Sequence, residues 1–145
     1  GAKGTLPGGK LNEDFKKRAA DLYKANHNAE LTEFAYLAES YDAVVLAALA
    51  AEASGSDTGE AIAASLQAVS TGGEKFDVAS GDAVEVLKAA FAAAKDGKDI
   101  DFDGFSGPID FDDNGDPSGA SIGIYQYGKD GTSTQIEVVA GNTVK

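Results

Sequence analysis

One acidic segment of the sequence, DIDFDGFSGPIDFDDNG, contains side chains whose types and spacing could bind calcium. It begins at Asp99, and Asp101, Asp103 and Gly104 complete the D-x-D-x-D-G opening of an EF-hand loop. Asp110 stands where the closing bidentate glutamate of such a loop normally lies. If this segment holds an ion, the protein is a calcium sensor or buffer. If it does not, the aspartates form turns and the function lies elsewhere.

The residues after Gly104 disagree with the EF-hand interpretation. An EF-hand needs a helix on both sides of its loop, whereas Gly107-Pro108 is followed by residues that alternate with the period of a strand. Ser106 occupies the position where paired loops normally carry an apolar residue, and Asp110 is shorter than the usual glutamate. We therefore favour turn-forming acids and predict no metal ligands. A small calcium-binding or interaction module using residues 99–116 remains the alternative function.

The sequence offers little for catalysis. His27 is the single histidine, and it lies between Asn26 and Asn28 where a helix is expected to end, which is typical of a solvated residue. Cysteine is absent, so thiolate chemistry and disulfides are excluded. No base is available for a nucleophile, and no glycine pair is followed by the Lys-Ser/Thr of a phosphate loop. We predict that the chain is not an enzyme, with no catalytic residues and no cofactor.

Composition limits the classes of partner. The 145 residues are 43% hydrophobic, which is enough for one domain. Twelve basic and 24 acidic residues give a net charge of -12, which repels nucleic acid and anionic membranes. The longest apolar run, Ala43–Ala51, is too short to span a bilayer, which needs about 20 residues. Methionine is absent, so we expect a processed chain or a fragment, whose signal segment is not in this sequence.

The spacing of apolar residues changes once along the chain. Between about residues 10 and 96 it has the period of helices, and we predict four of them. Their expected caps and ends are Asn12, Gly55, Asp57-x-x-Glu60, Ser80 and Gly97. Their expected inward residues are Leu11, Phe15, Leu22 and Tyr23; Leu37, Tyr41, Val44, Val45 and Leu49; Ile62, Leu66 and Val69; and Val84, Leu87 and Phe91.

After Gly104 the apolar residues alternate, which predicts short antiparallel strands around Ile122–Ile124 and Ile136–Val138, joined by a hairpin turn at Asp130-Gly131. Residues 1–9, with Pro7 between glycines, are expected to form a strand or a connector.

Three stretches of the sequence resemble one protein family. SGPIDFDDNGD at residues 106–116, followed by GIYQY at 123–127, is similar to the C-terminal signature of the type I solute-binding proteins of branched-chain amino acid ABC importers. FAYLAESYDAV at residues 34–44 resembles the helix of the same group that carries a Tyr-Asp-Ala step, and GTLP at 4–7 resembles its return from the second lobe to the first. The longer stretch at residues 72–104 implies that the fourth helix is an elaboration.

The resemblance implies an α/β fold, as a fragment of a type I periplasmic-binding-protein fold with two lobes: mostly helices, then short antiparallel strands. Residues 1–110 would be a helical portion of the first lobe, and residues 111–145 the crossing segment with the C-terminal strands. The implied function is the extracytoplasmic solute-binding component of an ABC importer, which carries branched-chain amino acids or related small molecules to a membrane permease. The implied location is periplasmic or extracellular, either free or tethered as a lipoprotein.

The resemblance also implies ligand-binding residues. Aligned on the Tyr-Asp-Ala step, the aromatic residue that lines the cleft falls on Tyr36, with Tyr41 further along the same helix. Most polar ligand contacts of the family come from an earlier part of the chain, so the ligand site here is expected to be incomplete. Helices that normally cover a sheet would then expose four apolar side chains, and we expect the fragment to self-associate. These side chains are Leu37, Val45, Leu49 and Ile62.

Overall fold

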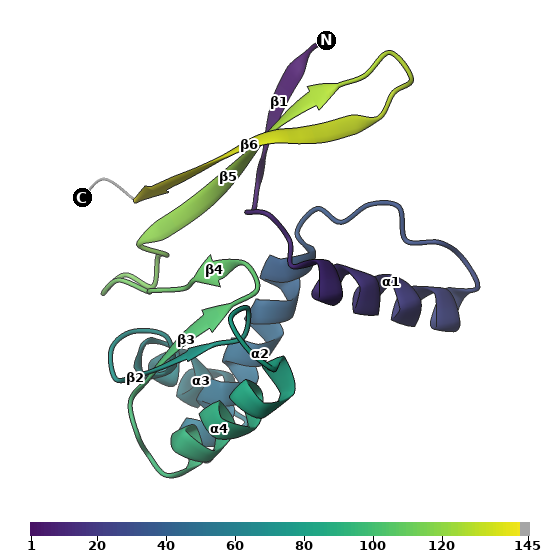
Figure 1. Cartoon of the computed structure of the whole chain (residues 1–145). Coiled ribbons are helices and arrows are strands. Elements are labelled where there is room, and N and C mark those ends of the chain that lie inside the picture. The colour runs from purple at the N-terminus through teal and green to yellow at the C-terminus, as the bar shows by residue number, and fades with distance from the viewer. Residues whose placement is uncertain (143–145) are drawn as a thin grey trace.

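In the computed structural model, which describes residues 1–142, the chain forms a mixed α/β structure with a helical part and a separate three-stranded sheet (Figure 1). The helices of these residues are α1 Glu13–His27, α2 Leu37–Ser54, α3 Gly59–Ser65, α4 Ala83–Lys95 and the short 3-10 helix Gln67–Val69. The strands are β1 Lys3–Pro7, β2 Glu74–Asp77, β3 Ile100–Gly104, β4 Gly107–Pro108, β5 Gly119–Tyr127 and β6 Ser133–Asn142.

The helices begin and end close to where the sequence predicts. The side chain of Asn12 caps α1 by accepting hydrogen bonds from the backbone N–H groups of Asp14 and Phe15, at 3.0 and 3.1 Å. Gly55 closes α2 in the left-handed conformation that glycine adopts without strain. The caps of α3 and α4 differ from the prediction by one and two residues, because Thr58 and Asp82 take the roles expected of Asp57 and Ser80.

The helical part contains a β-α-β unit that the sequence analysis missed. β2 and β3 pair in parallel, α4 connects them, and β4 returns antiparallel to β3. The strand β2 was missed because its four residues, Glu74–Asp77, include one apolar side chain, Phe76, and so show no alternation. The fourth helix is therefore the crossover that a parallel pair of strands requires.

The core of the helical part lies between β3 and the helices. Ile100 and Phe102 on one face of β3 are fully buried, together with Leu49 of α2 and Ala90 of α4. The expectation that Leu49 is exposed is therefore wrong, and Leu37, Val45 and Ile62 also pack against this core. The self-association expected through these four side chains loses its basis.

Three of the five residues predicted to face inward on α2, Leu37, Val45 and Leu49, do so, and two do not. Val44, predicted to face inward, is 71% exposed, and Tyr41 lies at the surface as well. Asp42, in contrast, is buried, along with Ala38 and Leu46. A carboxylate in an otherwise apolar helix face requires hydrogen-bond partners, and these are described below. No helix of residues 1–142 is long and apolar enough to cross a membrane.

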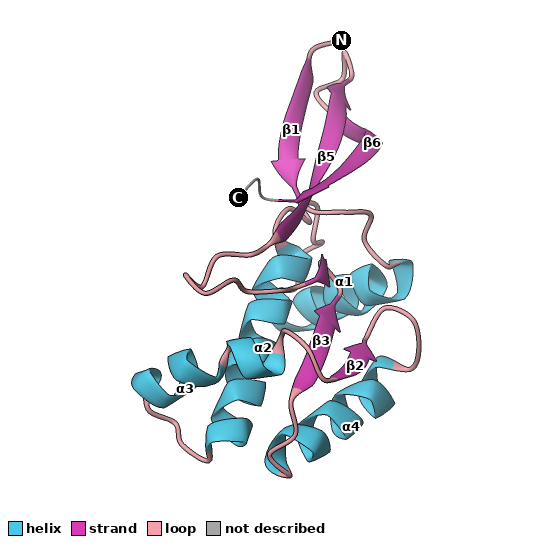
Figure 2. Cartoon of the chain, turned by 90° about the vertical axis from the view of Figure 1, so that its left-hand side faces the viewer, coloured by secondary structure: helices cyan, strands magenta, loops and turns pink. Residues whose placement is uncertain are grey.

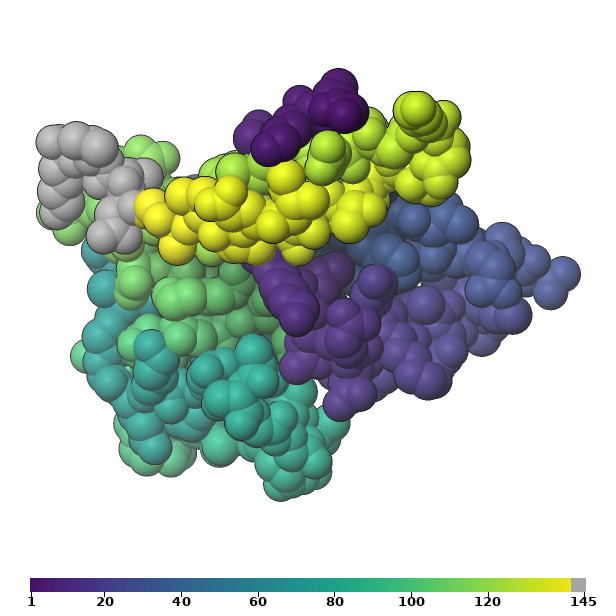
Figure 3. Space-filling view, turned by 45° about the horizontal axis from the view of Figure 1, so that its top comes forward, coloured from purple at the N-terminus to yellow at the C-terminus, as the bar shows by residue number. Residues whose placement is uncertain are grey.

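The second sheet has the strand order β1-β5-β6 and is antiparallel throughout. The predicted turn at Asp130-Gly131 joins β5 and β6, with the Asp130 carboxylate accepting a hydrogen bond from the backbone N–H of Thr132 at 3.1 Å. β6 runs across the surface in the space-filling view (Figure 3). Neighbouring residues of a strand point to opposite faces, so exposed Val138 and Val139 place apolar surface on both faces of this sheet.

We predict that two substitutions on α2 separate its buried and exposed faces. Leu49→Ala removes a fully buried side chain and should lower the free energy of unfolding by about 2–5 kcal/mol. Val44→Ala on the exposed face should change it by less than about 0.5 kcal/mol. Urea denaturation followed by circular dichroism measures both. Equal losses from the two variants would contradict the orientation of α2.

Candidate functional site

The carboxyl ends of β2 and β3 mark the edge of the helical part where a ligand site is expected. In open parallel α/β sheets, ligands bind outside the carboxyl ends of the strands. Both strands point toward the side on which the β1-β5-β6 sheet stands, and α2 begins on that same side (Figure 2). β3 ends at Gly104, and a two-residue turn, Phe105–Ser106, connects it to β4.

The carboxylate of Asp42 holds this turn from α2. Its Oδ1 accepts a hydrogen bond from the backbone N–H of Phe105 at 3.0 Å, and its Oδ2 accepts one from the N–H of Ser106 at 2.7 Å. The residues are more than 60 positions apart in the chain, and Asp42 is 1% exposed. One buried side chain thus satisfies both backbone donors of the turn, each of which would be costly to leave unpaired.

Gly104 makes the close approach of Asp42 possible. A Cβ atom at position 104 would overlap the carboxyl group of Asp42, which leaves no room for any side chain there. The φ angle of Gly104 lies outside the left-handed region, so its backbone conformation does not require glycine. The requirement for glycine comes from the lack of space for a side chain. Asp42 and Gly104 therefore form one packed unit that joins α2 to the end of β3.

Burial has a measurable consequence for the carboxyl group of Asp42. Removal from water raises its pKa above the ordinary aspartate value, and the hydrogen bonds from Ser106 and Phe105 oppose this only in part. The folded protein accordingly favours the protonated form of Asp42 relative to the unfolded chain.

Three aromatic rings pack beside the turn, and we call Phe15, Tyr41 and Phe105 the aromatic cluster. The rings of Phe15 and Phe105 are stacked with centroids 4.1 Å apart. Tyr41 meets both rings edge-on, at 5.2 Å from Phe15 and 5.6 Å from Phe105. Phe15 and Phe105 are buried, whereas Tyr41 is 36% exposed, so the tyrosine is the part of the aromatic cluster that a ligand can reach.

Tyr36 lies outside the aromatic cluster. It is the N-cap residue of α2, with φ 60° and ψ 10°, and its side chain makes no capping hydrogen bond. The residue is 50% exposed. A left-handed conformation in a residue other than glycine costs about 1 kcal/mol and is more frequent at functional positions than elsewhere.

The acidic segment does not have the geometry of a calcium loop. Its first half, Ile100–Gly104, is strand β3, in which Asp103 is buried and pairs with Lys75 at 2.9 Å. Its second half contains a turn in which Asp112 accepts hydrogen bonds from the N–H groups of Asn114 and Asp116, as predicted for turn-forming acids. Within residues 1–142, no three acidic or histidine side chains are grouped as a metal ion would require.

The pKa of Asp101, also on β3, is raised chiefly by burial, while the nearby Lys75 ammonium lowers it and the carboxylates of Asp103 and Asp110 raise it. Lys75 thus lies among carboxylates and in turn has a raised pKa, chiefly through its hydrogen bond to Asp103. Lys75 of β2 therefore forms ion pairs with Asp101 and Asp103 of the neighbouring strand β3.

The sequence matches the model of a known family, the receptor family ligand binding region, over residues 7–130. This chain belongs to that family. The receptor-family ligand-binding region is of the type I periplasmic-binding-protein kind, and the mixed α/β architecture described above is consistent with a portion of that fold. The family binds ligands and is not an enzyme family. No curated protein and no solved structure matches this chain significantly.

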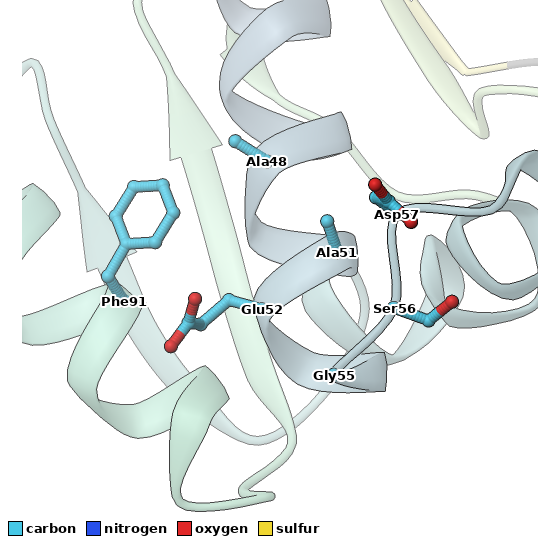
Figure 4. A pocket seen from close by; sticks show the side chains of 7 residues that line it. All are labelled: Ala48, Ala51, Glu52, Gly55, Ser56, Asp57 and Phe91. Carbon is cyan, nitrogen blue, oxygen red and sulfur yellow. The ribbon is translucent and has the colours of Figure 1, made fainter.

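A hollow elsewhere on this receptor-family chain is a weaker candidate. It lies at the C-terminal end of α2, where the ring of Phe91 on α4 faces Glu52 across the gap (Figure 4). Its lining residues are Ala48, Ala51, Glu52, Gly55, Ser56, Asp57 and Phe91. The hollow is shallow and mostly lined by small side chains, and the carboxylate of Glu52 already has Lys95 at 3.8 Å. Few polar groups converge there, in contrast to a typical ligand pocket.

The aromatic surroundings of Tyr41 have no signal in the sequence. Phe15 was predicted to face inward, but nothing in the sequence indicates that it stacks on Phe105, which is 90 residues away. Asp42 had a usable signal, since it is an isolated acid next to the apolar run Ala43–Ala51. A charge in that context indicates either an exposed position or a satisfied buried one.

We predict that Asp42 and Gly104 are energetically coupled. Asp42→Ala leaves the buried N–H of Phe105 and the partly buried N–H of Ser106 unpaired, and it should lower the free energy of unfolding by about 3 kcal/mol. Gly104→Ala forces Cβ against the carboxylate and should cost about 1–3 kcal/mol alone. In the Asp42→Ala background the same change should cost at least about 1 kcal/mol less, because the obstructing group is gone.

A double-mutant cycle by urea denaturation measures this coupling. Gly59→Ala is the matched control, because no atom lies within 4 Å of a Cβ added there and its φ angle is ordinary. That control should be neutral or slightly stabilising. Additive costs for the Asp42 and Gly104 changes, within about 0.5 kcal/mol, would contradict the packed unit.

The raised pKa of Asp42 predicts a pH dependence of stability. Folding takes up a proton on Asp42 between its ordinary and its raised pKa, so its contribution to the free energy of unfolding is fully present below the ordinary value and falls as the pH rises through the raised one. Asp42→Asn cannot titrate. The difference in unfolding free energy between wild type and Asp42→Asn should therefore be largest at about pH 3 and shrink toward pH 7. Asp101, whose pKa is also raised, is present in both proteins, so its contribution cancels from the difference in unfolding free energy. If the difference in unfolding free energy grows as the pH rises, the pKa of Asp42 is lowered by folding and the prediction is wrong.

Proposed function

We propose that this chain is part of an extracytoplasmic solute-binding protein that delivers an amino acid or a related small molecule to a membrane permease of the ABC importer class. The observation that carries the proposal is the aromatic cluster at the carboxyl end of β3, in a chain whose residues 7–130 match the receptor family ligand binding region. The cluster presents one exposed ring, Tyr41, at the edge where α/β sheets bind ligands.

Tyr36 and Tyr41 are the proposed ligand contacts. An aromatic face buries the apolar side chain of a branched amino acid without competing for its charged groups, and such burial contributes roughly 1.5–3 kcal/mol. Tyr41 is held in orientation by Phe15 and Phe105, so little side-chain entropy is lost when it contacts a ligand. Tyr36, in a left-handed conformation at the start of α2, is half exposed and so open to a ligand.

The proposed protein has two lobes that close around the ligand. Residues 1–110 would contribute mainly to the first lobe, and residues 111–145 would form the crossing segment and the C-terminal strands. The strand β1 belongs to the first of these ranges but pairs with β5, which belongs to the second. The β1-β5-β6 sheet has exposed apolar residues on both faces, and this supports the proposal that further parts of a two-lobed protein pack on it. Closure of two lobes is the usual mechanism of ligand capture in periplasmic binding proteins. The family is typically periplasmic or extracellular, which fits the proposed location.

Ligand titration of a parent protein that carries both lobes tests this function. Tyr36→Ala should weaken binding of leucine, isoleucine or valine by about 10-fold, because it removes part of the apolar contact, and a decade of affinity corresponds to roughly 1.4 kcal/mol. The control combines Asp101→Asn with Asp112→Asn, which changes the acidic segment and leaves the aromatic rings intact. Calorimetry should show little change for this control.

The opposite pattern would refute the assignment. If Tyr36→Ala binds as tightly as the wild type while the double aspartate variant loses binding, the acidic segment is the functional site. Calcium titration of the same samples then tests the alternative function.

A further inference from the structure

We propose that the outer edge of β6 pairs with the same edge of a second copy of this chain, so that two three-stranded sheets join into one sheet. This inference goes beyond the proposed function and does not depend on it, since it concerns the edge of the β1-β5-β6 sheet and not its faces. β6 is ten residues long, pairs with β5 on one side and has no strand on its other side within residues 1–142. Such an edge presents a row of backbone N–H and C=O groups to which another strand can add.

The two edges of this sheet differ in their protection against a further strand. β1, at the other edge, begins with Lys3 and ends with Pro7, and both residue types obstruct strand addition. β6 contains neither lysine nor proline, and Glu137 is its single charged residue. Its valines Val138 and Val139 are 40% and 47% exposed. β6 is therefore the edge that can accept a strand.

The distribution of charge favours a second copy as the partner. A net charge of -12 makes two copies repel each other, so they approach most closely where the charge is lowest. Every acidic residue except Asp130 and Glu137 lies within residues 8–116. The charges of these two acids are balanced by Lys3 and Lys129 in the sheet and its hairpin turn. The sheet is thus the neutral part of an acidic chain.

The regular part of β6 fixes the register of such a pair. A β-bulge at Ile136 interrupts the pairing with β5 and leaves residues 137–142 as the regular part. An antiparallel pair with a two-fold axis places one residue opposite its own copy. Centring the pair on Val139 brings two valine side chains together, whereas centring it on Ala140 brings together two smaller ones.

This register is also compatible with the charges. Val138 lies opposite Ala140 of the second copy, which is an apolar pair. Glu137 lies opposite Gly141 of the second copy, so the two carboxylates do not face each other. β6 is therefore complementary to itself.

Pairing through β6 leaves no unprotected edge. The joined sheet has the strand order β1-β5-β6-β6-β5-β1, so the strands that carry Lys3 and Pro7 are outermost on both sides. Because these strands obstruct further addition, association through strand edges ends at the dimer.

The test places a lysine at either of two positions of β6 in the 145-residue chain. Val139→Lys puts two ammonium groups opposite each other on the two-fold axis, whereas Gly141→Lys puts each ammonium group opposite Glu137 of the second copy. Gly141→Glu is the matched control, because it puts a like charge at the same place. A Cβ atom at position 141 would meet no atom of residues 1–142 within 4 Å, and the φ angle of Gly141 is not in the left-handed region.

Sedimentation equilibrium between about 10 μM and 1 mM measures dissociation constants from micromolar to millimolar. The wild type should form a dimer and no larger species. Gly141→Lys should lower the dissociation constant by about 2- to 25-fold, because the dimer contains two such cross-strand pairs. Gly141→Glu should raise it by a similar factor, and Val139→Lys should raise it by at least about 2-fold.

Three results would overturn the inference. They are a wild type that stays monomeric up to about 1 mM, species larger than a dimer, and equal association of Gly141→Lys and Gly141→Glu. Circular dichroism checks that each variant folds. If Val139→Lys does not fold, the two changes at position 141 still decide the question, because their charges are opposite and their position is the same.

Discussion

The buried carboxylate of Asp42 is the interaction on which the rest of the helical part depends. It accepts the two backbone N–H groups of the Phe105–Ser106 turn, and it fits only because position 104 is glycine. These contacts fix α2 against the end of β3. Phe105 is placed by the same turn, so the stacking on Phe15 and the orientation of Tyr41 follow from one carboxylate.

A charged group is a costly means of joining two elements, since removing it from water is unfavourable unless its hydrogen bonds are well formed. The raised pKa of Asp42 shows that part of this cost remains in the folded protein. In exchange, the carboxylate gives the turn one preferred position relative to α2. An apolar side chain at position 42 would pack against the turn but would leave both N–H groups without acceptors, and the turn would no longer have one preferred position.

The sequence was informative where the signal is local. The caps at Asn12 and Gly55, the Asp130-Gly131 hairpin and the turn at Asp112 all depend on residues within a few positions of each other, and each was predicted correctly. The family match over residues 7–130 supports the coarser part of the resemblance, a ligand-binding region of the type I periplasmic-binding-protein kind.

The sequence failed where packing between distant residues decides. The four residues of β2 have no strand periodicity, and the strand exists because β3 pairs with it and α4 covers it. The burial of Asp42 on α2 was not predicted, because its hydrogen-bond partners lie more than 60 residues away.

Amide hydrogen exchange at Phe105 and Ser106 tests the central claim most directly. The N–H groups in a two-residue hairpin turn ordinarily exchange quickly, because they have no partner but water. Held by the buried carboxylate of Asp42, these two should exchange only through global unfolding, as slowly as the amides of the core strand β3. Exchange of either amide at the rate of an exposed turn would show that Asp42 does not fix the turn, and the account of the aromatic cluster would fail with it.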